Sequence, residues 1–82
     1  MTYALSRLAP GSYDVLLDGM IVASLVRSGL RDNSTWTAEL LADGPSWKRP
    51  APFTESAHTF GSLEDARQWL GNPEIRDTGQ MG

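Results

Sequence analysis

The sequence contains no cysteine and only one histidine, His58. Without cysteine the chain can form no disulfide, no thiolate zinc site and no thiol nucleophile, and nothing in it requires an oxidising compartment. No apolar run approaches the roughly 20 residues of a membrane-spanning helix, and the N-terminus lacks the basic and apolar regions of a signal peptide. These absences predict a small cytoplasmic domain.

Charge is sparse as well, with ten acidic and seven basic residues and a formal net charge of −3. A modest acidic excess favours solubility and opposes binding to phosphate groups or to anionic membranes. A chain of 82 residues allows one domain with a thin core. We therefore expect a single domain over residues 1–82 that binds no membrane and for which nucleic acid is an unfavoured partner.

The pair Asp18-Gly19 lies between two apolar runs and predicts a β-hairpin. A type I′ turn needs positive φ at both central residues, which these two residue types tolerate. A direct two-residue connection would pair Val15 with Val22. In that register both faces of the hairpin are apolar, and the second face needs either a homodimer partner or a cover from elsewhere in the chain. The residues predicted on this second face are Leu16, Ile21, Ala23 and Leu25.

A short helix is predicted after residue 62. Ser62 fits the N-cap position, Asp65 lies three residues further on, and Gly71 with Pro73 ends the segment. Its apolar positions recur at helical spacing, which predicts packing against a sheet. These positions are Leu63, Ala66, Trp69 and Leu70.

Residues 35–43 and 58–60 predict a third strand and a short fourth strand, so the expected fold is an α+β domain. It has a three- to four-stranded antiparallel meander packed by one C-terminal helix, with a core over about residues 12–71. Residues 1–11 are expected to form either an extra strand or an arm. Residues 72–82 carry few apolar side chains and are expected to form a flexible tail.

No catalytic, cofactor-binding or metal-binding pattern is present. His58 has no cluster of further ligands near it in the sequence, and Glu64 with Asp65 fits the positive end of a helix dipole. The serines and glycines form neither a nucleophile elbow nor a phosphate-binding loop. The sequence therefore favours a protein that is not an enzyme and that uses no cofactor.

Two features of the sequence are more typical of a binding protein than of an enzyme. They are a Pro-rich segment over residues 43–57 and acidic residues spread over the predicted strands. In the segment, aromatic residues bracket two basic ones, which suits nucleic-acid contact, although the aromatics could instead fold back over the sheet. The acids could form a surface for a basic partner or could serve solubility alone. The candidate partner-binding residues are Asp14, Asp18, Glu39, Asp43, Trp47, Lys48, Arg49 and Phe53.

The order of a Trp-led strand, a strand ending in Phe and a helix with Ala and Trp on one face resembles the arm-type DNA-binding domains of phage integrases and AP2-like domains. That resemblance implies a three-stranded sheet that reads the major groove. The matching positions are Trp36, Phe60, Ala66 and Trp69. The third strand departs from the basic pattern of those families because it carries Thr35, Thr37 and Glu39.

The small, acidic, cysteine-free chain also resembles accessory proteins of phages and mobile elements, such as anti-CRISPR and anti-restriction inhibitors. This resemblance implies a non-enzymatic protein-binding module that blocks the nucleic-acid-binding surface of a host defence nuclease or complex. Two alternatives are a small β-sheet DNA-binding domain and a structural or assembly protein of a phage or plasmid. We also expect a homodimer in which the second sheet faces of two copies pack together. The alternative is that other segments of the same chain cover this face.

Overall fold

The computed structural model describes residues 2–29, 34–41 and 49–77. In these ranges the chain forms six strands and one helix. The strands are β1 (Tyr3–Ala9), β2 (Ser12–Leu17), β3 (Met20–Ser28), β4 (Thr35–Leu40), β5 (Ala57–Phe60) and β6 (Glu74–Asp77), and the helix is α1 (Leu63–Trp69). None of the helical segments in these ranges is long and apolar enough to cross a membrane.

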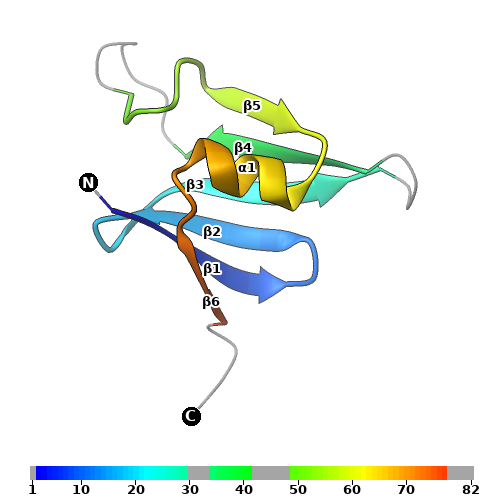
Figure 1. The fold of residues 1–82 in the computed structure, drawn as a ribbon, viewed down its shortest axis with the longest axis horizontal. Helices are drawn as coiled ribbons and strands as arrows, with labels where there is room; N and C mark the ends of the chain where they lie inside the picture. The colour runs from blue at the N-terminus through cyan, green and yellow to red at the C-terminus, as the bar shows by residue number, and fades with distance from the viewer. Residues whose placement is uncertain (1, 30–33, 42–48, 78–82) are drawn as a thin grey trace.

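All six strands belong to one mixed sheet in the order β5-β4-β3-β2-β1-β6. Neighbouring strands are antiparallel except β1 and β6, which are parallel. Helix α1 lies across one face of the sheet and connects β5 at one edge with β6 at the other (Figure 1). The chain therefore crosses the whole sheet once before its last strand.

The expected three- to four-stranded antiparallel meander is wrong, because the sheet also contains β1 and β6 and one of its pairs is parallel. The first segment is a full strand, and part of the expected tail is the edge strand β6. In β1 three consecutive residues, Ala4, Leu5 and Ser6, are buried, so the segment lacks the alternation that marks a one-sided strand. Strand β6 forms because it pairs with β1, which is distant in the sequence. Its own four residues show no pattern that predicts a strand.

The hairpin between β2 and β3 has the predicted turn but a shifted register. Asp18 and Gly19 have φ angles of 52° and 89°, as a type I′ turn requires. A β-bulge then leaves Val22 without a partner on β2 and pairs Val15 with Ala23. Beyond the bulge every side chain of β3 faces the side opposite to the one that a direct connection predicts.

Both ends of α1 are capped by the groups that the sequence indicates. The Ser62 hydroxyl accepts a hydrogen bond from the backbone N–H of Asp65 at 3.0 Å. At the other end the Gly71 N–H donates to the Gln68 carbonyl at 3.1 Å and the Asn72 N–H donates to the Arg67 carbonyl at 2.7 Å. This is the Schellman arrangement, and the φ of 89° at Gly71 is the reason a glycine suits it.

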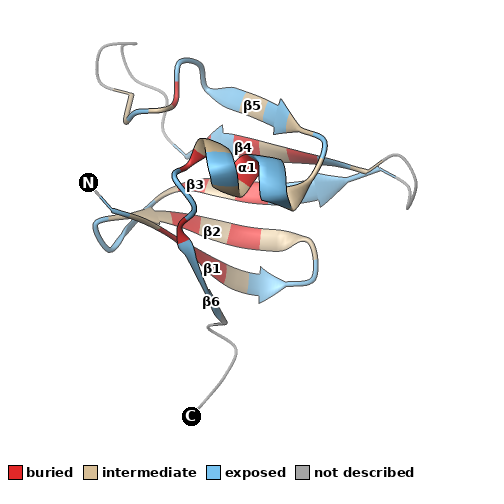
Figure 2. Ribbon diagram, in the orientation of Figure 1, coloured by how far each residue is buried: buried red, intermediate tan, exposed pale blue. Residues whose placement is uncertain are grey.

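The core lies between α1 and the centre of the sheet. Figure 2 shows buried segments in the central strands behind α1, while β5 and β6 are mainly intermediate or exposed. At one end of the core, the Trp69 ring lies 4.8 Å from Phe53 and 5.0 Å from Phe60, centroid to centroid. The buried apolar residues of this core are Leu5, Tyr13, Val15, Ala23, Leu25, Trp36, Ala38, Leu40, Phe53, Ala66 and Leu70. Ala4 is also buried, but on the opposite face of the sheet.

Candidate functional site

The face of the sheet opposite α1, here called the open face, has no second layer among the described residues. Paired residues on neighbouring strands share a face, so the registers assign its members. Leu5, Val15, Ala23 and Leu40 form one row on the helix side, and the residues beside them along each strand point the other way, except the bulged Val22, which packs against the core. The open face is therefore the surface on which a binding function can be sought.

An acidic row crosses the middle of the open face. Asp14 of β2 lies opposite Ser24 of β3, and Ser24 lies opposite Glu39 of β4. Two strand spacings separate the two acids, which places their Cα atoms about 10 Å apart. The small serine between them leaves both carboxylates accessible to the same partner. Asp14 and Glu39 are thus on one face, as strand alternation predicts.

Apolar side chains flank the acidic row on both sides. Leu16 pairs with Ile21 on one side, and Val26 lies between Ser12 and Thr37 on the other. Ile21 is 51% exposed and Val26 is 41% exposed. Scattered exposed apolar residues are ordinary on a protein surface. Their position on either side of two carboxylates makes the open face suited to a surface that is both basic and apolar.

The charges of the strands are divided between the two faces. Arg7 pairs with Tyr13 and Arg27 pairs with Trp36, so both arginines belong to the helix side. The edge strand β6 adds Glu74 and Arg76 to the open face, because they pair with Ala4 and Ser6. Together with the two acids of the row, the open face carries three acidic side chains and one basic one, a net charge of −2 over the six strands.

Two residues predicted on the second sheet face are not there. Ala23 and Leu25 are 0% exposed and belong to the core under α1, so the face assignment of these two residues is wrong. The physical reason is the bulge at Val22, which turns the following part of β3 over. Leu16 and Ile21 do lie on the open face. The homodimer that was expected through this face stays a prediction.

Residues 49–56, the described part of the loop before β5, pack on the helix side of the sheet. Phe53 is 4% exposed and packs edge to face against Trp69, with ring centroids 4.8 Å apart. The Tyr3 hydroxyl donates to the Ala51 carbonyl at 2.7 Å, and an Arg49 Nη1–H donates to the Thr54 carbonyl at 3.0 Å. These contacts assign Phe53 and Arg49 to the structure of the loop. Three other candidates, Asp43, Trp47 and Lys48, lie outside the described residues.

Asp18 and His58 also have structural contacts. The Asp18 carboxylate accepts a hydrogen bond from the Thr2 N–H at 2.9 Å, and the backbone N–H of Asp18 donates to the Thr2 carbonyl. The Nε2 atom of His58 accepts from the backbone N–H groups of Thr54 and Glu55, both at 3.2 Å. These two hydrogen bonds assign His58 a role in holding residues 54 and 55 of the loop against β5.

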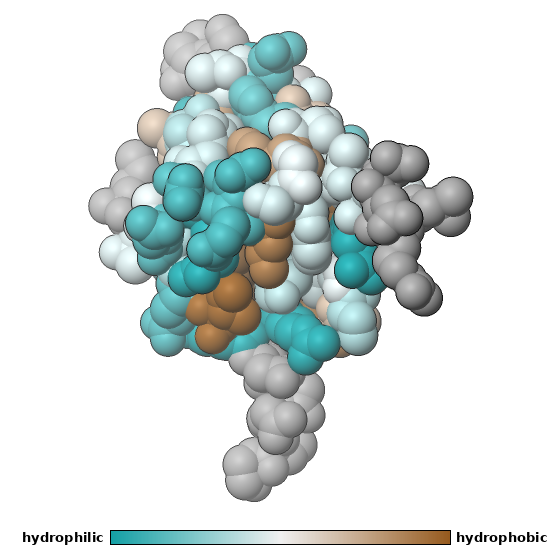
Figure 3. Space-filling model, turned by 45° about the vertical axis from the view of Figure 1, so that its right-hand side comes forward, coloured by the Kyte–Doolittle hydropathy of each residue, from teal (hydrophilic) through white to brown (hydrophobic). Residues whose placement is uncertain are grey.

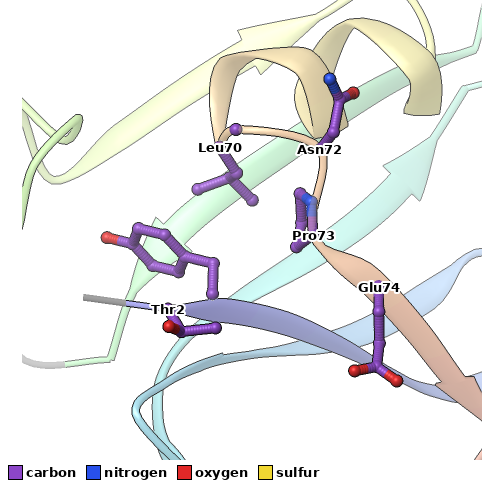
Figure 4. Close-up of a pocket in the computed structure, with 7 residues that line it drawn as sticks. Thr2, Leu70, Asn72, Pro73 and Glu74 are labelled. Carbon is purple, nitrogen blue, oxygen red and sulfur yellow. The ribbon is translucent and has the colours of Figure 1, made fainter.

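A hollow of about 400 Å³ lies where β1, the end of α1 and β6 meet. Thr2, Leu70 and Pro73 gather around it, whereas the side chains of Asn72 and Glu74 extend away from Leu70 (Figure 4). The helix side also exposes hydrophilic side chains mixed with a smaller group of apolar ones (Figure 3). Neither feature brings convergent polar groups together, as a small-molecule site requires.

Metal chemistry has no support in the part of the chain that the structure describes, where no group of three or more His, Asp or Glu side chains could hold an ion. Comparison of the chain with protein-family models, curated proteins and solved structures finds no significant match. The candidate function therefore rests on the open face alone. Its acids could be found by alternation along β2 and β4, and Ile21 follows from the direct turn, whereas the place of Val26 on this face depends on the bulge.

Proposed function

We propose that this chain is a non-enzymatic protein-binding module whose open face docks on a basic and apolar surface of another protein. The observation that carries the proposal is the row of Asp14, Ser24 and Glu39 on the uncovered side of the sheet. Leu16, Ile21 and Val26 border this row and would exclude water from it in a complex. Charge complementarity of this kind steers association and selects among partners.

The narrower proposal is an inhibitor that blocks the nucleic-acid-binding surface of a host defence complex of the CRISPR or restriction type. Surfaces that bind nucleic acid are rich in lysine and arginine, which is the chemistry that an acidic face complements. The same acids oppose direct binding of this face to phosphate groups. DNA binding through the open face is thus the less favoured alternative.

The test compares three forms of the protein as bait in native-host extract. They are the wild type, the open-face variant Asp14→Lys/Glu39→Lys, and the control Glu55→Lys/Glu64→Lys, which makes the same charge change elsewhere. A specific partner should be recovered by the wild type and the control and lost with the open-face variant. Recovery by all three forms would contradict the proposal.

The inhibitor proposal can be tested separately by a competition experiment once a partner has been purified. Duplex DNA should compete with the protein for that partner, and the competition should weaken as salt rises because DNA binding releases counterions. A partner that binds the protein and DNA at the same time, without competition, would contradict the inhibitor proposal while leaving the binding module intact.

A further inference from the structure

The outer edge of β6 is a second candidate surface, distinct from the acidic row of Asp14, Ser24 and Glu39. β6 pairs with β1 on one side and ends the sheet, so its other edge has no strand partner among the described residues. Such an edge presents backbone N–H and C=O groups in position to pair with a further strand. Figure 1 shows this edge at the end of the sheet that is farther from β5.

Along β6 an acidic, an apolar and a basic side chain follow one another, namely Glu74, Ile75 and Arg76. Glu74 and Arg76 lie on the open face, where an Arg76 Nη2 atom is 3.3 Å from a Glu74 carboxylate oxygen. Ile75 lies opposite Leu5 on the helix side and is 40% exposed. In an antiparallel pair centred on the middle residue, this order is complementary to itself.

We propose that a second copy of this chain pairs antiparallel with β6 about a two-fold axis through Ile75. In that arrangement Glu74 of each copy faces Arg76 of the other, and the two Ile75 side chains meet. Opposite charges directly across an antiparallel pair are stabilising, and a symmetric dimer requires a self-complementary patch of this kind. The inference does not rest on the proposed binding function.

Charged residues on an edge strand usually prevent pairing, because a second strand would bring like charges together. In β6 the antiparallel register brings unlike charges together instead. The opposite edge, β5, offers no comparable selection, since Ala57–Phe60 contains no acidic residue and no lysine or arginine. The charge pattern therefore favours β6 over β5 as the edge that pairs with a copy of itself.

The dimer is expected to be weak and in exchange with the monomer. β6 has four residues and follows Pro73, which has no N–H to donate, so the paired length is short. Contacts of this length bury less than the about 1,200–2,000 Å² of stable interfaces. Both copies would present their open faces on the same side of one continuous sheet, so the dimer would display two acidic rows to a partner.

The first experiment is sedimentation velocity of the full chain from about 10 μM to about 1 mM, a range that covers weak association. Glu74→Arg and Arg76→Glu each place like charges opposite one another and should raise the dissociation constant about tenfold. The double variant Glu74→Arg/Arg76→Glu restores unlike pairs and should associate about as well as the wild type. The control Glu39→Arg makes the same charge change far from β6 and should have no effect.

The second experiment needs no variant, because the sequence contains two isoleucines, Ile21 and Ile75. With isoleucine methyl groups labelled, the Ile75 methyl signal should shift with protein concentration and the Ile21 signal should stay constant. A shift of Ile21 alone would place the contact on the open face and overturn the proposal. A monomer throughout the range, or a double variant that fails to associate, would overturn it as well.

Discussion

Trp69→Ala tests whether the aromatic cluster at the end of α1 holds the helix to the sheet. The Trp69 ring lies 4.7–5.0 Å, centroid to centroid, from the rings of Phe53, His58 and Phe60. It thus joins the helix to the loop before β5 and to β5 itself. Truncation to alanine removes all three contacts and leaves a cavity beside Phe53, which is buried.

The magnitude follows from the burial of the site. Removing a core aromatic side chain costs about 3–5 kcal/mol, and the partial exposure of Trp69 sets the expectation at about 3 kcal/mol. An 82-residue domain has a total stability of about 4–12 kcal/mol, so the loss is a large part of it. At about 4–8 °C for each kcal/mol, the melting temperature should fall by about 12–24 °C.

The assay is urea unfolding at about 25 °C, followed by far-UV circular dichroism so that the loss of a tryptophan fluorophore does not disturb the signal. Gln68→Ala, the exposed neighbour on the same helix, is the control and should change stability by at most about 0.5 kcal/mol. A loss below about 1 kcal/mol for Trp69→Ala would refute the assignment of this ring to the core.

Four further substitutions test other parts of the fold. Leu25→Ala should cost about 3 kcal/mol in urea unfolding and Ile21→Ala less than about 1 kcal/mol, and equal losses would contradict the bulged register. Ser62→Ala should cost about 1 kcal/mol by removing the helix cap, and helicity by circular dichroism should fall with it. Burial raises the pKa of the Tyr3 phenol above its ordinary 10.0, so stability should be intact below about pH 10 and fall above it. Tyr3→Phe should make that fall smaller in unfolding curves at alkaline pH, and an unchanged fall would contradict this role.

The local features of the fold could be predicted because short-range chemistry decides them. The turn at Asp18 and Gly19 needs positive φ, and few residue pairs supply it at both positions. The helix start at Ser62 and its end at Gly71 are marked by residues that satisfy free backbone groups. Each of these signals spans only a few residues and does not depend on the rest of the chain.

The register of β3 could not be predicted because one residue decides it. Alternation along β3 is compatible with either face, and the bulge at Val22 selects the one that buries Ala23 and Leu25. This choice removes both residues from the expected second face. By contrast, the shared face of Asp14 and Glu39 followed correctly from alternation within their own strands.

The edge strand β6 could not be predicted because its partner is distant in the sequence. The strand has a single apolar residue, Ile75, which is 40% exposed and lies opposite Leu5 of β1. The helix brings the two segments together by carrying the chain across the sheet. With β6 in place, Ala4 and Ser6 are buried on the open face between the longer side chains of the flanking strands.

The acidic row and the β6 edge can be tested separately through Glu39 and Glu74, which lie far apart on the same face, whereas only Ser6 separates Asp14 from Arg76. Glu39 is on β4 and Glu74 is on β6, with β3, β2 and β1 between them. Four strand spacings of about 4.8 Å place them about 19 Å apart. This exceeds the screening length of about 8 Å at physiological ionic strength, so a charge reversal at one site is barely sensed at the other. A Glu39→Arg variant that lost partner binding but kept its association would therefore separate the acidic row from the β6 edge.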